Sequence, residues 1–444
     1  MSNKSVGAMA CPRPQNVGAG RVPARNSSFL ISHSSFLLLL ALLPCTAFAQ
    51  KKDFTYKFYG QIRTDLFYNT RDNSETVDGL FYMFPLDESL DANGNDLNDD
   101  DNSNLYTLYS RVGIDVTGPM LGKAKTSAKI EADFRGSGST LSVVRLRHAY
   151  FQLDWTRHTL LVGQTWHPLY GDVAPQILNL NMGAPYQPFS RAPQIRYRYH
   201  NKKFMLTAAL LWQSQYTSVG PSSTTAGTTS TTKSQNYIKN GTIPEVFFGL
   251  DYKDPAFQAG AGIHVSSIVP RTESVVDDET YAVDERVTGV SGEAHFKYSA
   301  GDWLVAGKTV LSTNLTQTST VGGYGIKSID SVTGEQEYSP LRISHSWLNI
   351  AYGSKWRPAL FFGYLKNLGA TDEVSYGVLA TGGSLDQLAT ASAELTYNIP
   401  NWKFGAEYMF CNAWYGDEFN AKHKATSSHS ISNHRIVLTA MFVF

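Results

Sequence analysis

The chain of 444 residues has little cysteine, no excess of either charge and few candidates for a spanning helix. Of its three cysteines, Cys11 and Cys45 lie in the first 49 residues, which leaves Cys411 alone in the rest. One thiol cannot form an intramolecular disulfide or a cysteine metal cluster. Basic and acidic residues number 38 each, and four of the basic residues lie before residue 50, so the remainder is slightly acidic. This balance argues against nucleic acid as a partner.

The beginning of the chain has the features of an export signal. Two arginines precede an apolar run over 36–43, which ends in a small-x-small triplet, Ala-Phe-Ala. This order is typical of a bacterial secretory signal and predicts cleavage before Gln50. Cys45 leaves a lipoprotein signal as an alternative, although the proline before it fits that pattern poorly. We therefore expect a signal peptide over 1–49 and one domain over 50–444.

The rest of the chain alternates apolar and polar residues between turns. Tyr56, Phe58 and Ile62, for example, alternate with Arg63 and Asp65. No apolar run after the signal is long enough for a transmembrane helix. An exported chain with strand periodicity and many aromatic residues predicts a barrel in the outer membrane of a Gram-negative bacterium, with lipid against its outer face. Closure of a barrel satisfies every backbone hydrogen bond inside the lipid.

About sixteen segments have this alternation, and short connections alternate with long ones. The pattern predicts an all-β fold, a transmembrane antiparallel β-barrel of about sixteen strands with short periplasmic turns and long outer loops. The chain also ends on an aromatic residue, Phe444, as outer-membrane barrels commonly do. Besides strands around Ile130 and after Thr159, the predicted strands cover 54–69, 105–117, 145–154, 194–200, 204–215, 245–252, 257–269, 290–298, 303–315, 341–352, 356–368, 385–399, 402–415 and 431–444.

Arginine is densest between residues 145 and 199, where it recurs two residues apart. Residues two apart in a strand share a face. A charge on the lipid face costs about 2–4 kcal/mol, so these pairs should point into the lumen. The same alternation sends Ala149 inward and Leu146, Tyr150 and, without an evident reason, His148 toward lipid. The predicted inward cations are Arg63, Arg111, Lys129, Arg135, Arg145, Arg147, Arg196 and Arg198.

Two interpretations of these cations remain open. A row of inward arginines sets a positive field in a narrow pore and favours small anions. Alternatively, they pair with four acids predicted on the same face and simply line a wet wall. The segment 170–192 is rich in proline and apolar residues, which is unusual for a loop in open water. We expect it to fold into the lumen and narrow it, with Arg191 near the constriction.

Three stretches carry a resemblance to a known family. They are RLRHAYF from Arg145, LLVGQTWHPLYGD from Leu160 and RAPQIRYRY from Arg191. They resemble the DcaP-like family of trimeric outer-membrane porins, closely over roughly residues 104–200. The resemblance implies a homotrimer of sixteen-stranded subunits whose arginine-rich constriction favours small organic acids, with the arginine pairs of 145–198 as constriction residues. The helical segment that often precedes the barrel in that family has no counterpart here.

Other functions are less well supported. The acidic loop 91–102 has the alternate oxygen residues of a Ca²⁺ loop but lacks the final glutamate, so a solvated loop is the simpler interpretation. The histidines show no ligand spacing, and no set of nucleophile, base and third partner is evident, so we expect neither a metal, a cofactor nor an enzyme. The remaining alternative to a passive diffusion channel is a surface binding protein or adhesin that acts through its long loops.

Overall fold

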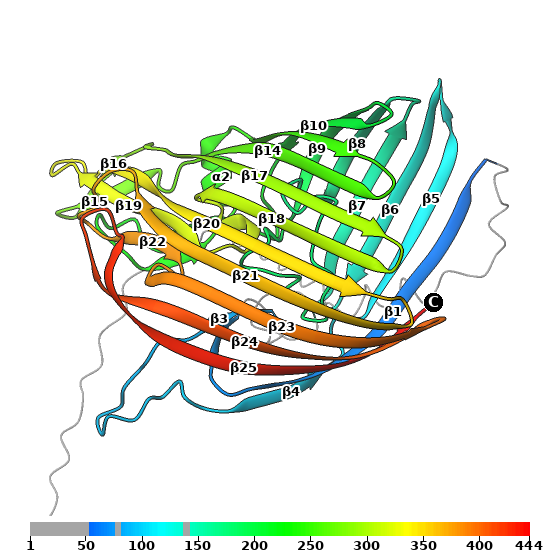
Figure 1. Cartoon of the computed structure of the whole chain (residues 1–444). Helices are drawn as coiled ribbons and strands as arrows, with labels where there is room; N and C mark the ends of the chain where they lie inside the picture. The colour runs from blue at the N-terminus through cyan, green and yellow to red at the C-terminus, as the bar shows by residue number, and fades with distance from the viewer. Residues whose placement is uncertain (1–52, 76–80, 136–142) are drawn as a thin grey trace, which may run out of the picture. The chain divides into compact units, whose positions relative to one another are not determined.

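The computed structural model describes residues 53–75, 81–135 and 143–444, which lie in one compact unit (Figure 1). The predicted signal peptide over 1–49 lies outside the described residues, as does the segment 136–142. Within the described part of the chain, no helix is long and apolar enough to cross a membrane.

Sixteen antiparallel strands form a closed barrel, which confirms the predicted fold class. Each strand pairs with its neighbours in sequence, and the last pairs with the first. One of the sixteen is interrupted by a turn and counts as two elements, β4 and β5, which both pair with β1. The barrel strands are β1 (Thr55–Asn69), β4 (Asn102–Tyr106), β5 (Arg111–Leu121), β6 (Ala124–Asp133), β7 (Arg145–Asp154), β8 (His158–Trp166), β9 (Arg191–His200), β10 (Phe204–Leu211), β13 (Glu245–Lys253), β14 (Phe257–Ile268), β17 (Val287–Ala300), β18 (Trp303–Thr313), β20 (Gln336–Tyr352), β21 (Trp356–Ala370), β23 (Leu385–Ile399), β24 (Trp402–Phe419) and β25 (Ala425–Val443).

The two ends of the chain close the barrel. β1 and β25 pair over nine residue positions from Gln61 to Asn69. The Gly60 N–H donates to the Phe444 carbonyl at 2.9 Å, and the Phe444 N–H donates to the Gly60 carbonyl at 3.1 Å. A Cβ atom on Gly60 would lie 2.6 Å from Cζ of Phe444, so the terminal ring requires a glycine opposite it.

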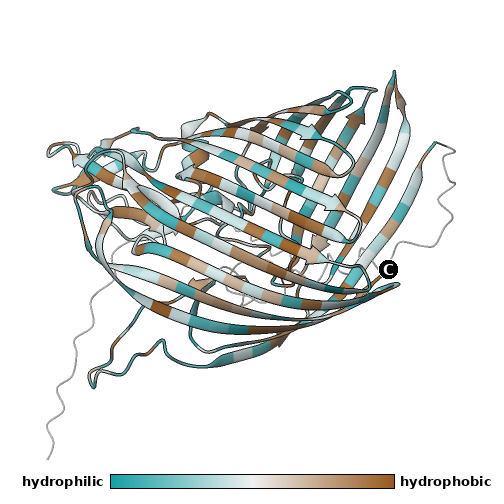
Figure 2. Ribbon diagram, viewed as in Figure 1, coloured by the Kyte–Doolittle hydropathy of each residue, from teal (hydrophilic) through white to brown (hydrophobic). Residues whose placement is uncertain are grey.

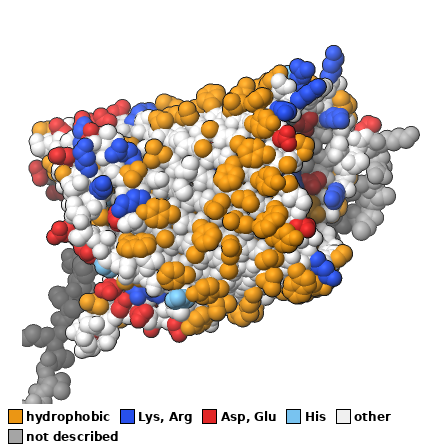
Figure 3. Space-filling model, viewed as in Figure 1, with side chains coloured by type: hydrophobic (Ala, Val, Ile, Leu, Met, Phe, Trp, Pro, Cys, Tyr) orange, Lys and Arg blue, Asp and Glu red, His pale blue; other side chains and the backbone are white. Residues whose placement is uncertain are grey.

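The outer face carries the apolar half of the alternation. Figure 2 shows hydrophobic and hydrophilic residues alternating along the strands. On the face shown in Figure 3, hydrophobic side chains cover the middle, and charged side chains gather toward the two ends. Phe58 and Phe248 are exposed by 77% and 61%, whereas the inward Asp65 is exposed by 2%. In a bilayer this belt buries apolar side chains against acyl chains and keeps charges at the interfaces.

A β-bulge in β7 corrects the faces predicted for this strand. Register shifts by one residue where β7 pairs with β6, between Leu146 and His148. The bulge turns both Arg147 and His148 inward, with exposed fractions of 1% and 8%. Beyond it the alternation is inverted, so Tyr150 faces the lumen and Ala149 does not, contrary to the prediction. Strict alternation fails here because a bulge adds one residue to only one strand.

The connections differ between the two ends of the barrel. One end has short turns, such as 201–203 and 353–355, whereas the other carries long loops with small elements of their own. The first turn follows Leu121, because β5 extends beyond residue 117, where this strand was predicted to end. The loop elements are β2 (Asn73–Glu75), β3 (Tyr82–Pro85), β11 (Val219–Pro221), β12 (Thr231–Lys233), α2 (Asn236–Gly241), β15 (Glu273–Val276), β16 (Glu279–Ala282), η1 (Thr316–Thr318), β19 (Gly322–Ile329) and β22 (Val378–Thr381).

Candidate pore constriction

The segment 167–190, which connects β8 to β9, lies inside the barrel. Its four prolines interrupt backbone pairing, so it takes its hydrogen bonds from lumenal side chains instead. Lys308 of β18 donates from Nζ to the carbonyl oxygens of Leu169 (2.6 Å) and Tyr170 (3.0 Å). Trp347 of β20 donates from Nε1 to Oε1 of Gln187 at 2.8 Å. The loop therefore crosses the lumen to the wall opposite β8.

Two glutamates and one arginine hold the tip of this loop. Glu394 of β23 accepts the Leu178 N–H at 2.6 Å, and Glu407 of β24 accepts the Asn179 N–H at 2.8 Å. Arg63 of β1 donates to the Leu178 carbonyl at 2.6 Å. All of these side chains are buried. The tip is thus bound by buried hydrogen bonds to its backbone, of which the one from Arg63 is charge-assisted and belongs to the stronger class.

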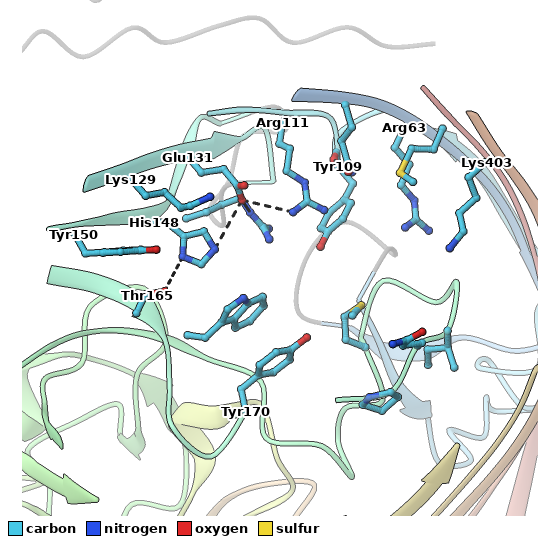
Figure 4. A pocket seen from close by; sticks show the side chains of 18 of the residues that line it. Arg63, Tyr109, Arg111, Lys129, Glu131, His148, Tyr150, Thr165, Tyr170 and Lys403 are labelled. Atoms are coloured by element: carbon cyan, nitrogen blue, oxygen red, sulfur yellow. Dashed lines mark hydrogen bonds and ion pairs between the residues drawn. The ribbon is translucent and has the colours of Figure 1, made fainter. Parts of the chain in front are cut away.

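A cavity of about 620 Å³ separates the loop from the wall formed by β1 and β5 to β8 (Figure 4). Six cationic side chains and one carboxylate, Glu131, line it. Tyr170 and Met182 of the loop form part of the other side. The cationic lining residues are Arg63, Arg111, Lys129, Arg147, Arg357 and Lys403.

The cations of the near wall are paired with acids. Arg63 donates from Nε and Nη2 to Asp65, at 2.8–3.0 Å. Glu131 is shared, because it lies 2.5 Å from Arg147 and 3.5 Å from Arg111. The remaining near-wall cation, Lys129, lies 2.8 Å from a carboxylate oxygen of Asp115. These acids fix where the cationic groups stand.

Aromatic rings lie among the guanidinium groups. Four guanidinium carbons, those of Arg63, Arg111, Arg135 and Arg147, lie 4.8–5.6 Å from the ring centroid of Tyr109. Trp166 stacks on Tyr170 with the ring centroids 3.9 Å apart. Planar guanidinium groups stack well on ring faces, so the rings hold the arginines in place without neutralising them.

The structure divides the eight predicted arginines into three groups. Arg63, Arg111 and Arg147 line the cavity. The second group packs beside it: Arg145 binds Asp133, and Arg135 and Arg191 are fully buried against aromatic rings. Arg196 and Arg198 lie away from the cavity lining, and Arg198 is 3.4 Å from the carboxylate of Asp172 at the base of the loop.

Two cationic side chains on the far side of the cavity, Arg357 and Lys403, were not predicted as site residues from the sequence. Both are inward positions of alternating strands, so the same periodicity would have found them if it had been followed past the sixth strand. His148 and Tyr150 were missed because of the bulge. Closure of the predicted barrel brings the last strands beside the first, but the sequence does not show which of their side chains meet at one cavity.

Two histidines and a glutamate form a buried cluster at the start of the inner loop. Oε2 of Glu245 lies 2.9 Å from Nε2 of His264 and 3.4 Å from Nε2 of His167. The two histidines therefore lie close together in the fold, although their spacing in the sequence is not that of metal ligands. However, Nδ1 of His167 accepts the Leu169 N–H at 3.1 Å, which leaves the proton of a neutral ring on Nε2. A metal needs a lone pair at that nitrogen. The cluster therefore fits a hydrogen-bond anchor for the loop better than a metal site.

A closed sixteen-stranded barrel with a loop inside the lumen and a charged cavity beside that loop is the architecture of a porin. Residues 46–213 match the model of a family described as DcaP outer membrane protein, which confirms the resemblance seen in the sequence. Over these residues the chain is similar to that family, and the rest of the barrel is similar to porins in fold. No curated protein sequence is significantly similar to it.

Solved structures agree on the fold. The outer membrane channel DcaP of Acinetobacter baumannii superimposes with a TM-score of 0.61 at 16% identity, over 89% of this chain and 98% of that one. OmpT of Vibrio cholerae, expressed in the outer membrane, matches with a TM-score of 0.52 at 13% identity, over 89% and 99% of the two chains. Its in-vitro folded form, described as a trimer, matches with a TM-score of 0.50 at 13% identity, over 88% and 100%.

Proposed function

We propose that this protein is a passive diffusion channel of the outer membrane that favours small anionic solutes such as organic acids. The observation that carries the proposal is the lining of the cavity beside the inner loop. Six cationic side chains line it, the four on the near wall are paired with acids, and Lys403 on the far side has no carboxylate within ion-pair distance among the described residues. In a narrow passage between protein walls, fixed charges act through a lower dielectric than water and are only partly screened by salt. An anion is therefore stabilised in the passage and a cation is excluded.

The mechanism needs no chemistry and no cofactor. The inner loop narrows the lumen, and solutes pass between it and the wall that carries Arg63, Arg111 and Arg147. Lys403 is the most effective cation of the set, because among residues 53–75, 81–135 and 143–444 no carboxylate lies within ion-pair distance of its Nζ. A carboxylate solute can offer the partner that this side chain lacks.

Export and assembly belong to the same proposal. A signal peptide over 1–49 would direct the chain to the periplasm, and cleavage would release the barrel domain. We propose a homotrimer, supported by the resemblance to trimeric porins and by the trimer form of a structural neighbour. The predicted arginines that do not line the cavity, such as Arg135 and Arg191, would add to the positive electrostatic potential inside it.

Single-channel recording in a planar bilayer tests the proposal. The reversal potential in a KCl gradient around 0.1 M should show anion selectivity. Insertion of single trimers should raise the conductance in groups of three equal steps. Lys403→Glu should lower the anion-to-cation permeability ratio about threefold to tenfold, the effect of reversing one charge at a few ångströms in a partly hydrated passage. Lys327→Glu is the matched control, because Lys327 lies on β19, a strand of the long loops, away from the cavity lining.

Two results would contradict the proposal. Cation selectivity of the unmodified protein would mean that the lumenal acids dominate the field. The absence of any conductance in a correctly folded barrel would favour a surface binding protein that acts through its outer loops.

A further inference from the structure

An apolar furrow of about 500 Å³ runs over the outer face of four adjacent strands, β9, β10, β13 and β14. Strand register arranges its outward side chains in two rows across the strands. Large exposed side chains form its walls, among them Phe248 and Ile263, and two alanines, Ala208 and Ala261, form its low points. The row farther from the short turns is Tyr197, Ala208, Phe248 and Ile263, and the nearer row is Tyr199, Leu206, Leu250 and Ala261.

The end of the furrow near the short turns carries basic and aromatic residues. The His200 N–H donates to the Arg157 carbonyl at 2.7 Å, which holds the turns β7–β8 and β9–β10 together. Lys202 and Lys203 are exposed on the second turn. Nζ of Lys203 donates to the hydroxyl of Tyr252 at 3.3 Å and lies 5.6 Å from its ring centroid. Tyrosine and lysine at this level are typical of the region where lipid headgroups sit.

These cations have no acidic partner in the described part of the chain. There, no carboxylate lies within ion-pair distance of Arg157, Lys202 or Lys203. Strand β10 rises about 3.4 Å per residue, so Lys203 and Ala208 are about 17 Å apart, close to half the ~30 Å core of a bilayer. A positive rim beside an apolar furrow of this length is complementary to a phosphate joined to an acyl chain.

We propose that the furrow is a binding site for one anionic phospholipid of the periplasmic leaflet. One acyl chain lies in the furrow over Ala208 and Ala261, and the phosphate contacts Lys202 and Lys203. The site is independent of the pore, because every furrow side chain that forms the two rows points away from the lumen.

Native mass spectrometry of the purified protein, mixed with equal amounts of phosphatidylglycerol and phosphatidylcholine, tests this site. The unmodified protein should retain phosphatidylglycerol in preference. Ala208→Leu with Ala261→Leu fills the furrow, and Lys202→Glu with Lys203→Glu reverses the rim. The lysine pair should lower phosphatidylglycerol retention about tenfold or more, since one lysine near an anionic lipid contributes about fivefold. The alanine pair should also lower it, because the added side chains occupy the place of the acyl chain.

Matched controls separate the site from general effects of substitution. Ala391→Leu with Ala393→Leu adds the same volume to the outer face of β23, and Lys355→Glu reverses a lysine that lies 5.6 Å from the ring of Tyr397 at another short turn. Both controls should retain lipid as the unmodified protein does. Equal retention of the two lipids by the unmodified protein, or undiminished retention by the filled variant, would overturn the proposal. So would a change of oligomeric state in the filled variant, because it would make the furrow a contact between subunits.

Discussion

Glu394 and Glu407 should fix the position of the inner loop, and removing both should free its tip. Each carboxylate accepts one backbone N–H of the tip, at 2.6 and 2.8 Å. Glu394 and Glu407 are direct cross-strand neighbours, and two carboxyl groups this close are not both charged. A hydrogen bond contributes about 1.5–3 kcal/mol to a charged group and about 0.5–1.5 kcal/mol to a neutral one, so the double substitution Glu394→Ala/Glu407→Ala should destabilise the attached loop by about 2–4.5 kcal/mol. The ratio of attached to detached loop should then fall about thirtyfold to two-thousandfold.

Single-channel recording reports the position of the loop through unit conductance and current noise. The double alanine variant should show a larger mean conductance and frequent transitions between levels. The Gln/Gln variant loses the same charge but keeps carbonyl acceptors, so it should recover much of the steady current. Asp386→Ala is the control, because Asp386 is buried on β23 and pairs with Lys366 rather than with the loop. A double alanine variant with the conductance and noise of the unmodified protein would refute this account of the loop.

Three further outcomes follow from the geometry. Glu245→Ala leaves His167 and His264 without an acceptor and should destabilise the folded barrel by about 2–6 kcal/mol, since each buried donor without an acceptor costs about 1–3 kcal/mol. The measurement is the temperature at which the folded band shifts to the unfolded position in gel electrophoresis, which should fall. EDTA should leave that temperature unchanged, because a proton occupies Nε2 of His167; a drop would show a bound metal. Gly60→Val should cost about 1–3 kcal/mol by the same assay, since its Cβ would clash with the ring of Phe444, whereas Gly292→Val, with no atom nearer than 4.0 Å, should cost less.

Much of the fold is predictable from sequence because strand alternation is local. β7 and β23 begin and end at the predicted residues, 145–154 and 385–399, and the other barrel strands differ mainly at their ends. The inward or outward direction of a side chain follows from the same period of two. It fails in β7, where the bulge at Arg147 and His148 changes the phase, and the sign of it in the sequence is that strict alternation places His148 toward lipid.

The site is harder to predict because it is made by contacts between distant segments. The sequence indicates that 170–192 is an unusual loop, but not that its tip reaches β23 and β24. The sequence also identifies the arginines but not the acidic side chains that pair with them. Asp133, for example, holds both Arg145 and Arg147, so that neither position can be judged from its charge alone.

The pairing of charges, rather than the number of arginines, determines which residues should set selectivity. Each cation on the near wall has a carboxylate within ion-pair distance, so that wall is close to neutral. On the far side, Arg357 is 3.9 Å from Glu394, whose other oxygen is engaged by the loop, and Lys403 has no such partner among the described residues. The uncompensated positive charge of the cavity therefore comes largely from the far side. Substitution of Lys403 should change ion selectivity more than substitution of Arg145 or Arg196, although the arginine-rich stretch is the more conspicuous feature of the sequence.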